Sequence, residues 1–144
     1  IVYANDSYLR EDFLFRGKMK HTAIRGTRGA EVIDELPVLE SDIVLPKRRF
    51  SAFFKTDLDM TLRTLRIDTI AVTGLTTEVC VLSTVLDGLA NDFNSVLISD
   101  CCASRSRETH DAVVAAFSRF PTYPTLRVRT AEEFLAEAGG EAVL

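Results

Sequence analysis

Residues 72–84 read VTGLTTEVCVLST. A β-branched run ends at Gly74, two threonines turn the chain, and an apolar pattern with helical spacing follows. Cys80 therefore falls in the first turn of a helix that begins directly after a strand. Backbone N–H groups and the positive end of the helix dipole at such a turn favour a thiolate, the nucleophilic form of cysteine. From position alone, a buried structural cysteine is the favoured alternative.

The chain on both sides of this stretch alternates between apolar runs and amphipathic segments. The pattern predicts strands at 1–6, 42–45, 69–74, 95–99 and 125–128, and helices at 31–36, 56–66, 77–91 and 106–120, with a TAEE capping box at 130–133. Apolar strands separated by helices are typical of a parallel sheet covered on both faces. We predict one α/β domain over residues 1–144, a doubly wound and mostly parallel sheet with helices on both faces and a site at the carboxyl ends of its strands.

Composition excludes several classes of protein. The 144 residues are 47% hydrophobic with a formal charge of −4, which indicates one globular domain and argues against binding of nucleic-acid phosphates. No apolar run is long enough to span a bilayer, and the first residues lack the features of a signal peptide, so we expect a cytoplasmic protein with a small-molecule partner. Three cysteines without a CxxC pair predict reduced thiols.

Several ordered motifs carry a family resemblance. They are KRRFSAF at 47–53, TDLD at 56–59, DTIAVTGLTTEVCV at 68–81, SDCCAS at 99–104 and RETH at 107–110. NDS after the first strand and GTRGAEVIDEL at 26–36 belong to the same set. Over almost its whole length the chain resembles the isochorismatase-like cysteine hydrolases, in particular the branch related to N-carbamoylsarcosine amidohydrolase.

The resemblance implies a catalytic Asp, Lys and Cys. Cys80 matches the nucleophile, and Lys47 matches the lysine that stabilises the thiolate and orients the acid. A non-proline cis peptide is implied between Leu75 and Thr76, with the amides of Thr76 and Cys80 forming an oxyanion hole. A solvated loop charge is the alternative for Lys47, and a slip of one residue would exchange it for the neighbouring Arg48.

Three further residues are candidates for binding substrate. Arg48, beside Arg49, has the bidentate geometry that suits a substrate carboxylate, although solvation or a subunit salt bridge is an alternative. Phe53 is a candidate for lining the pocket, although aromatic residues with this spacing are usually core or interface. Thr77 is predicted mainly to cap the nucleophile helix, with contact to substrate as a second role.

The catalytic acid of the family has no counterpart here. In the family it ends the first strand, whereas IVYAND at 1–6 corresponds to the second strand. Asp6 also closes a strand but belongs to a different motif, so we do not assign the base to it. We expect the chain to be N-terminally incomplete relative to the family and to lack its first strand.

We predict no metal and no cofactor. Nicotinamidases of the family hold a divalent ion with an Asp-x-His step after the second strand and with further histidines. The corresponding step here is Asp6-Ser7-Tyr8, and the only histidines are His21 and His110.

The resulting hypothesis is cysteine-dependent hydrolysis of a C–N bond in a small amide or N-carbamoyl compound through a thioester, in a homo-oligomer. Cys80 argues against a true isochorismatase, which acts on a vinyl ether without this cysteine. Two alternatives stay open. One is a catalytically inactive family member acting as a subunit or binding protein, and the other is a redox-sensing role for Cys80.

Overall fold

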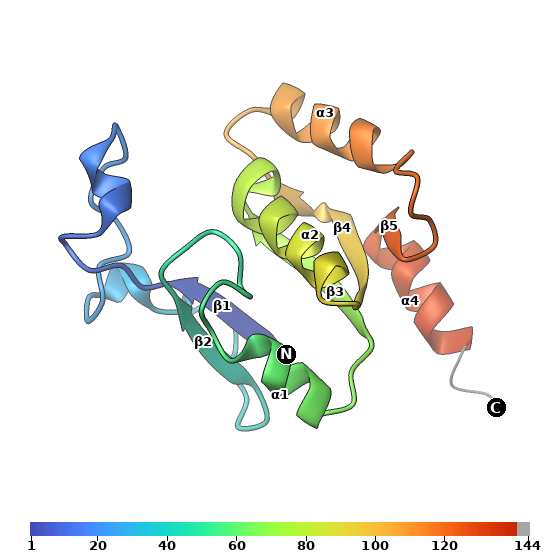
Figure 1. Cartoon of the computed structure of the whole chain (residues 1–144), viewed down its shortest axis with the longest axis horizontal. Coiled ribbons are helices and arrows are strands. Elements are labelled where there is room, and N and C mark those ends of the chain that lie inside the picture. Colours follow the sequence, from blue (N-terminus) through green and yellow to red (C-terminus); the bar gives the residue numbers. More distant parts are fainter. Residues whose placement is uncertain (141–144) are drawn as a thin grey trace. The chain divides into compact units, whose positions relative to one another are not determined.

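The computed structural model describes residues 1–140 (Figure 1). The chain divides into two compact units, the first ending at Leu58 and the second beginning at Asp59. Within the described residues, no helix is long and apolar enough to cross a membrane.

The first unit contains a two-stranded parallel sheet. Strand β1 (Val2–Asp6) pairs with β2 (Ile43–Lys47), so that Asp6 stands opposite Lys47. The prediction that the second strand ends at residue 45 is wrong, because Pro46 pairs in register with Asn5 and the strand continues to Lys47. Proline is tolerated where its missing N–H faces a sheet edge, and among residues 1–140 β2 pairs only with β1.

Irregular chain joins these two strands. It contains two 3₁₀ turns, η1 (Phe13–Arg16) and η2 (Arg28–Ala30), and a single bridge between Tyr8 and Ile24. The helix predicted over residues 31–36 is wrong, since this stretch forms turns. Six residues offer too few hydrogen bonds to offset the cost of nucleating a helix.

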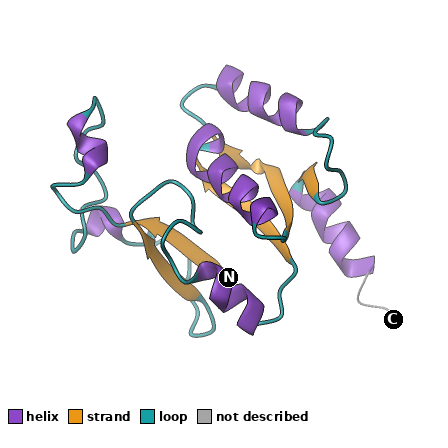
Figure 2. Ribbon diagram, viewed as in Figure 1, coloured by secondary structure: helices purple, strands orange, loops and turns teal. Residues whose placement is uncertain are grey.

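The second unit begins within α1, which starts one residue earlier, and continues as alternating strands and helices (Figure 2). Its elements are α1 (Leu58–Thr64), β3 (Thr69–Leu75), η3 (Thr77–Val81), α2 (Leu82–Ala90), β4 (Asn94–Ala103), α3 (Arg107–Phe117), β5 (Leu126–Arg129) and α4 (Ala131–Gly140). The strands form a parallel sheet in the order β3-β4-β5. This arrangement confirms the predicted α/β class.

Helices cover both faces of β4. Val81 and Val85 pack with Leu97 of β4, together with side chains of α3. Val96 and Ile98 alternate with Leu97 and so point to the opposite face, where they are also buried. Burial on both faces explains the continuous apolar run at residues 96–98 of this strand.

Two predicted helix starts are confirmed in atomic detail. The Ser106 hydroxyl accepts a hydrogen bond from the Thr109 amide at 3.1 Å, which caps α3. At the start of α4, the Thr130 amide donates to Glu133 at 2.8 Å, and the Glu133 amide donates to the Thr130 hydroxyl at 3.2 Å. These reciprocal bonds form the capping box indicated by TAEE.

Candidate active site

The end of β3 turns sharply before the cysteine helix. Gly74 has φ of +117°, a left-handed conformation that glycine adopts without steric cost, and the register with β4 shifts between Val72 and Gly74. The next peptide bond, between Leu75 and Thr76, is cis, at the position where the family resemblance implies one.

Cys80 lies in the π-helix η3 rather than in the regular α-helix that the pattern predicts. The Val81 amide donates to the Thr76 carbonyl, five residues back, at 3.2 Å. Cys80 is half-buried, and its carbonyl accepts a hydrogen bond from the Thr84 hydroxyl at 2.8 Å. Single π turns of this kind are frequent at functional sites.

Thr77 does not cap this helix, so that prediction is wrong. Thr76 occupies the N-cap position without a side-chain cap bond. The Thr77 side chain is instead fully buried, and its hydroxyl lies 2.9 Å from Nδ1 of His110 in the first turn of α3. The buried hydroxyl thus has a hydrogen-bond partner, as buried polar groups generally do.

A pocket of about 530 Å³ opens beside this hydrogen bond, at the carboxyl end of β4 and the start of α3. Ser104, Ser106, Arg107 and His110 line it, whereas Cys80 is not among the lining residues. A location at the carboxyl ends of parallel strands is where ligands of such sheets bind.

Glu78 connects η3 to the wall of this pocket. Its carboxylate accepts a hydrogen bond from the Ser104 hydroxyl at 2.6 Å. That bond, with further hydrogen bonds to the Glu78 amide and the Thr76 hydroxyl, lowers the pKa of Glu78. Glu78 therefore carries its negative charge in the first turn of the helix, where the helix dipole favours an anion.

In the first unit, Lys47 is almost fully buried and is not a solvated loop charge. Its ammonium group forms an ion pair with Asp6 and donates to the Arg49 carbonyl at 3.1 Å. Parallel pairing of β1 with β2 brings the two strand ends together and produces this contact. Sequence reasoning did not pair Asp6 with Lys47, because the partner across a strand depends on register.

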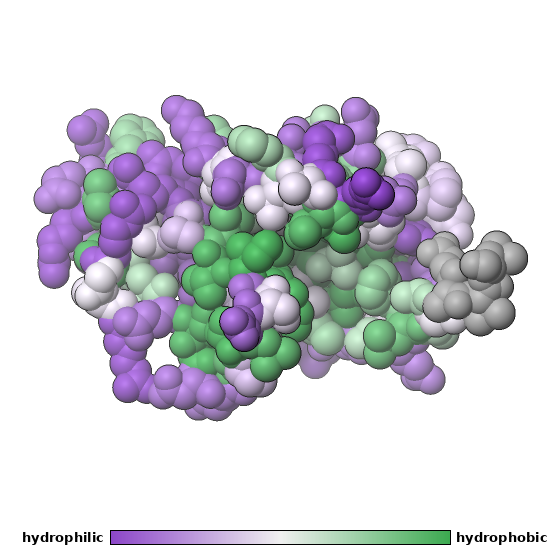
Figure 3. All heavy atoms as spheres, turned by 90° about the horizontal axis from the view of Figure 1, so that it is seen from below, coloured by the Kyte–Doolittle hydropathy of each residue, from purple (hydrophilic) through white to green (hydrophobic). Residues whose placement is uncertain are grey.

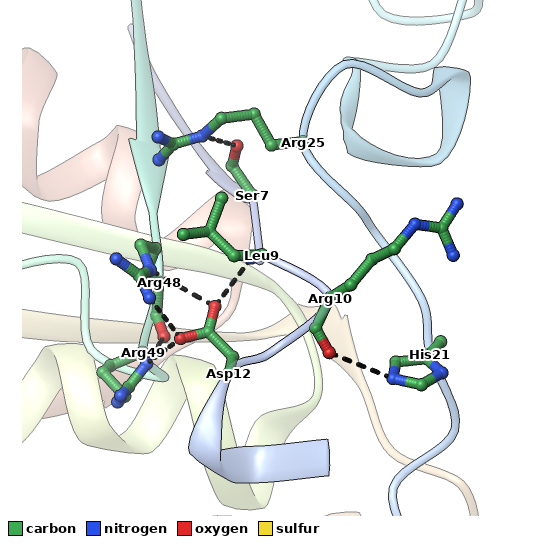
Figure 4. Close-up of polar contacts among 8 residues, drawn as sticks. All are labelled: Ser7, Leu9, Arg10, Asp12, His21, Arg25, Arg48 and Arg49. Carbon is green, nitrogen blue, oxygen red and sulfur yellow. Dashed lines mark hydrogen bonds and ion pairs between the residues drawn. The ribbon is translucent and has the colours of Figure 1, made fainter.

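Arg48 and Arg49 meet a carboxylate of the protein itself, that of Asp12 (Figure 4). Arg48 binds it through two nitrogens, at 2.5 and 3.2 Å, while Arg49 lies 3.3 Å away. The Leu9 amide donates to the same carboxylate at 2.7 Å. The hydrogen bond from Arg48 is the largest cause that lowers the pKa of Asp12 to about 2.

The remaining predicted residues have local roles. The Phe53 amide donates to the Ser51 hydroxyl at 3.1 Å, and His21 bonds the Arg10 carbonyl at 3.2 Å. Residues 1–140 contain no group of three or more His, Cys, Asp or Glu side chains that could hold a metal ion.

The predicted site residues thus fall into two sets. Lys47, Arg48 and Phe53 belong to the first unit, and residues 75–77 with Cys80 belong to the second. Sequence reasoning missed His110, Glu78 and Asp12 as members of these sets. The RETH motif that contains His110 was the available signal for one of them.

Comparison with known proteins identifies the family. The Isochorismatase domain model matches residues 1–133. An isochorismatase-like hydrolase from Alkaliphilus metalliredigens is 34% identical, with a TM-score of 0.87 over 95% of this chain and 72% of its own. N-carbamoylsarcosine amidase from Thermoplasma acidophilum is 32% identical, with a TM-score of 0.79 over 92% of this chain and 72% of its own. The chain belongs to the isochorismatase family of hydrolases.

Relatives known by sequence differ in their described activities. The isochorismatase family protein YwoC of Bacillus subtilis is 37% identical over 75% of this chain, which spans 55% of YwoC. Ureidoacrylate amidohydrolase RutB of Cronobacter sakazakii is 46% identical over 49% of this chain and 30% of RutB. A protein of Arabidopsis thaliana, "Probable inactive nicotinamidase At3g16190", is 40% identical over 78% of this chain and 61% of its own length.

Proposed function

We propose that the protein hydrolyses a C–N bond in a small amide or N-carbamoyl compound, with Cys80 as the nucleophile. The observation that carries this proposal is the place of Cys80, in a π turn that follows the carboxyl end of β3. Ligands of parallel α/β sheets bind at that edge. Similarity to proteins named N-carbamoylsarcosine amidase and ureidoacrylate amidohydrolase supports the choice of bond.

In the proposed reaction, the Cys80 thiolate attacks the carbonyl carbon and forms a C–S bond, while the carbonyl electron pair moves to oxygen. The amides of Thr76 and Cys80 are proposed to stabilise that oxyanion. The C–N bond then breaks, and the nitrogen leaves with a proton as an amine or ammonia. Water attacks the resulting thioester, which releases the acid and returns the thiol.

Other residues have supporting roles in this proposal. Lys47 stabilises the thiolate, as the family resemblance implies. Phe53 contacts the substrate. The Arg48 guanidinium is already bonded to Asp12, and the Thr77 hydroxyl is already bonded to His110. Each contacts the substrate only by sharing that polar group between two partners. The general base that accepts the thiol proton is not assigned to a residue of this chain.

The test is ammonia release from N-carbamoyl amino acids, ureidoacrylate and nicotinamide. Cys80→Ala should lower turnover by about a thousandfold or more, because it removes the attacking atom. Cys101→Ala is the matched control, since it removes an exposed thiol, and it should keep parent activity. Turnover that survives Cys80→Ala would exclude Cys80 as the nucleophile.

A role as an inactive subunit or binding protein is the second candidate. Its support is the 40% identity to the Arabidopsis protein named as an inactive nicotinamidase. This role predicts that ureidoacrylate or an N-carbamoyl amino acid raises the melting temperature of the protein by mass action, without any release of ammonia. Ammonia release that depends on Cys80 rejects it.

A further inference from the structure

A hydrogen bond between distant parts of the second unit joins the nucleophile helix to α3. The Thr77 hydroxyl and Nδ1 of His110 lie 2.9 Å apart, although the two residues are separated by 33 positions. Thr77 is fully buried, and the His110 amide donates to the Ser106 carbonyl at the capped start of α3. A buried hydroxyl that loses its partner keeps its full desolvation cost, so this bond holds Thr77 in one orientation.

The chemistry of both groups allows this bond to form in more than one direction. A threonine hydroxyl can donate or accept, and Nδ1 of histidine accepts in one neutral tautomer and donates in the other and in the imidazolium. The bond therefore forms with either neutral tautomer of His110. The ring itself lines the pocket at the end of β4.

A second hydrogen bond ties the same turn to the same segment. Ser104, which also lines the pocket, donates to the carboxylate of Glu78 at 2.6 Å. Two consecutive residues of η3 are thus held by residues 104–110, which run from the end of β4 into α3. Cys80 follows two and three residues after these attachment points, within the same π turn.

We propose that His110 is a positioning residue for Cys80: through Thr77 it fixes the first turn of η3 and thereby the direction of the Cys80 side chain. The proposal rests on the proposed function in taking Cys80 as the nucleophile. It assigns His110 no contact with the reacting atoms, and its effect passes through the buried hydroxyl of Thr77.

The experiment measures the rate at which iodoacetamide alkylates Cys80 in the folded protein, by peptide mass spectrometry, with the exposed Cys101 as an internal reference. His110→Ala and Thr77→Val should each lower the ratio of the two rates by about five- to tenfold, because each removes one end of the bond. The double variant should show no further loss, since both changes remove the same interaction.

Conservative variants separate positioning from a general loss of packing. The amide of asparagine reaches about as far as Nδ1 of histidine, whereas that of glutamine reaches about as far as Nε2. His110→Asn should therefore restore most of the alkylation ratio and His110→Gln should not, while Thr77→Ser should behave as the parent. His21→Ala is the matched control and should leave the ratio unchanged, because His21 lies in the first unit, where it bonds the Arg10 carbonyl and packs against the Phe15 ring.

Each contrary outcome overturns the proposal. These outcomes are a Cys80 that iodoacetamide does not reach in the parent, an unchanged ratio in His110→Ala, additive losses in the double variant, or rescue by Gln in place of Asn. Melting followed by circular dichroism shows which variants are folded. If His110→Ala is unfolded, the variants His110→Asn, His110→Gln and Thr77→Ser decide the outcome. Alkylation needs no turnover, so absence of ammonia release would reject the proposed function and leave this result standing.

Discussion

At the scale of single residues, the clearest effect is on the ionisation of Asp12. Its side chain is buried, yet it receives hydrogen bonds from Arg48, Arg49 and the Leu9 amide. Desolvation alone would raise the pKa of this carboxyl, but the hydrogen bond from Arg48 outweighs it and the pKa falls from 3.8 to about 2. The contact also occupies the arginine that sequence reasoning assigned to a substrate carboxylate.

Asp12 should make the first unit sensitive to acid. Because its folded-state pKa is depressed, the stabilisation is complete above about pH 4 and is lost as the pH falls toward about 2. Asp12→Asn should lower the local stability at pH 7 by about 1–3 kcal/mol and flatten its dependence on acid. Amide hydrogen exchange of the peptide around residues 5–16, at several pH values, measures both effects.

Asp34→Asn is the matched control for Asp12→Asn. Asp34 pairs with Arg28, but both side chains are largely exposed, and such pairs contribute little. Equal exchange in the two variants, or an unchanged acid profile in Asp12→Asn, would contradict the role given to Asp12.

At the scale of elements, close packing of α2 on the sheet positions the strand–turn–helix unit that carries Cys80. Gly88 of α2 faces Ile70 of β3 and Ser95 of β4. A Cβ atom at Gly88 would lie 2.5 Å from Cδ1 of Ile70 and 2.6 Å from Oγ of Ser95. Glycine, which is otherwise unfavourable inside a helix, leaves room here for the side chains of Ile70 and Ser95.

Gly88→Ala should therefore destabilise the second unit. Overpacking costs about 1–3 kcal/mol, part of which the better helix propensity of alanine offsets by about 1 kcal/mol. Gly139→Ala in α4 is the control, because a Cβ there meets nothing within 4 Å, and it should leave stability unchanged or raise it. Urea unfolding followed by circular dichroism compares the two, and equal effects would reject the close-packing explanation.

At the scale of the whole molecule, the main feature is that many large apolar side chains stay exposed and are not buried in the core. Figure 3 shows apolar side chains in green on the face that it draws. In the first unit, the large apolar side chains that are at least 45% exposed include Ile33, Leu36, Val38, Leu39 and Val44. Extended apolar surface is typical of interfaces.

We accordingly expect a homo-oligomer, as the family resemblance implies. Light scattering coupled to size exclusion should give a mass that is a multiple of the 16.0 kDa chain. Replacing Leu36 and Leu39 by Ser should shift that mass toward the monomer, because both side chains are exposed and apolar. A monomer at all protein concentrations would contradict this expectation.

The sequence alone determined what depends on local periodicity. Apolar runs and caps predicted the α/β class, the order of strands and helices along the chain and the place of Cys80 after β3, and the ordered motifs identified the family. It failed at residues 31–36, at Pro46 and at the first turn of η3. The segment 31–36 is too short for a stable helix, and a sheet edge tolerates Pro46. At the first turn of η3, tertiary packing outweighs the local capping preference.

Only the tertiary structure decided which side chains meet. The pairs Thr77 with His110, Glu78 with Ser104, Arg48 with Asp12 and Lys47 with Asp6 join residues 26 to 41 positions apart. Such contacts depend on strand register and on how each helix packs, neither of which a local pattern contains. Sequence therefore indicated Cys80 and Lys47 as candidate site residues, while the contacts around them came from the fold.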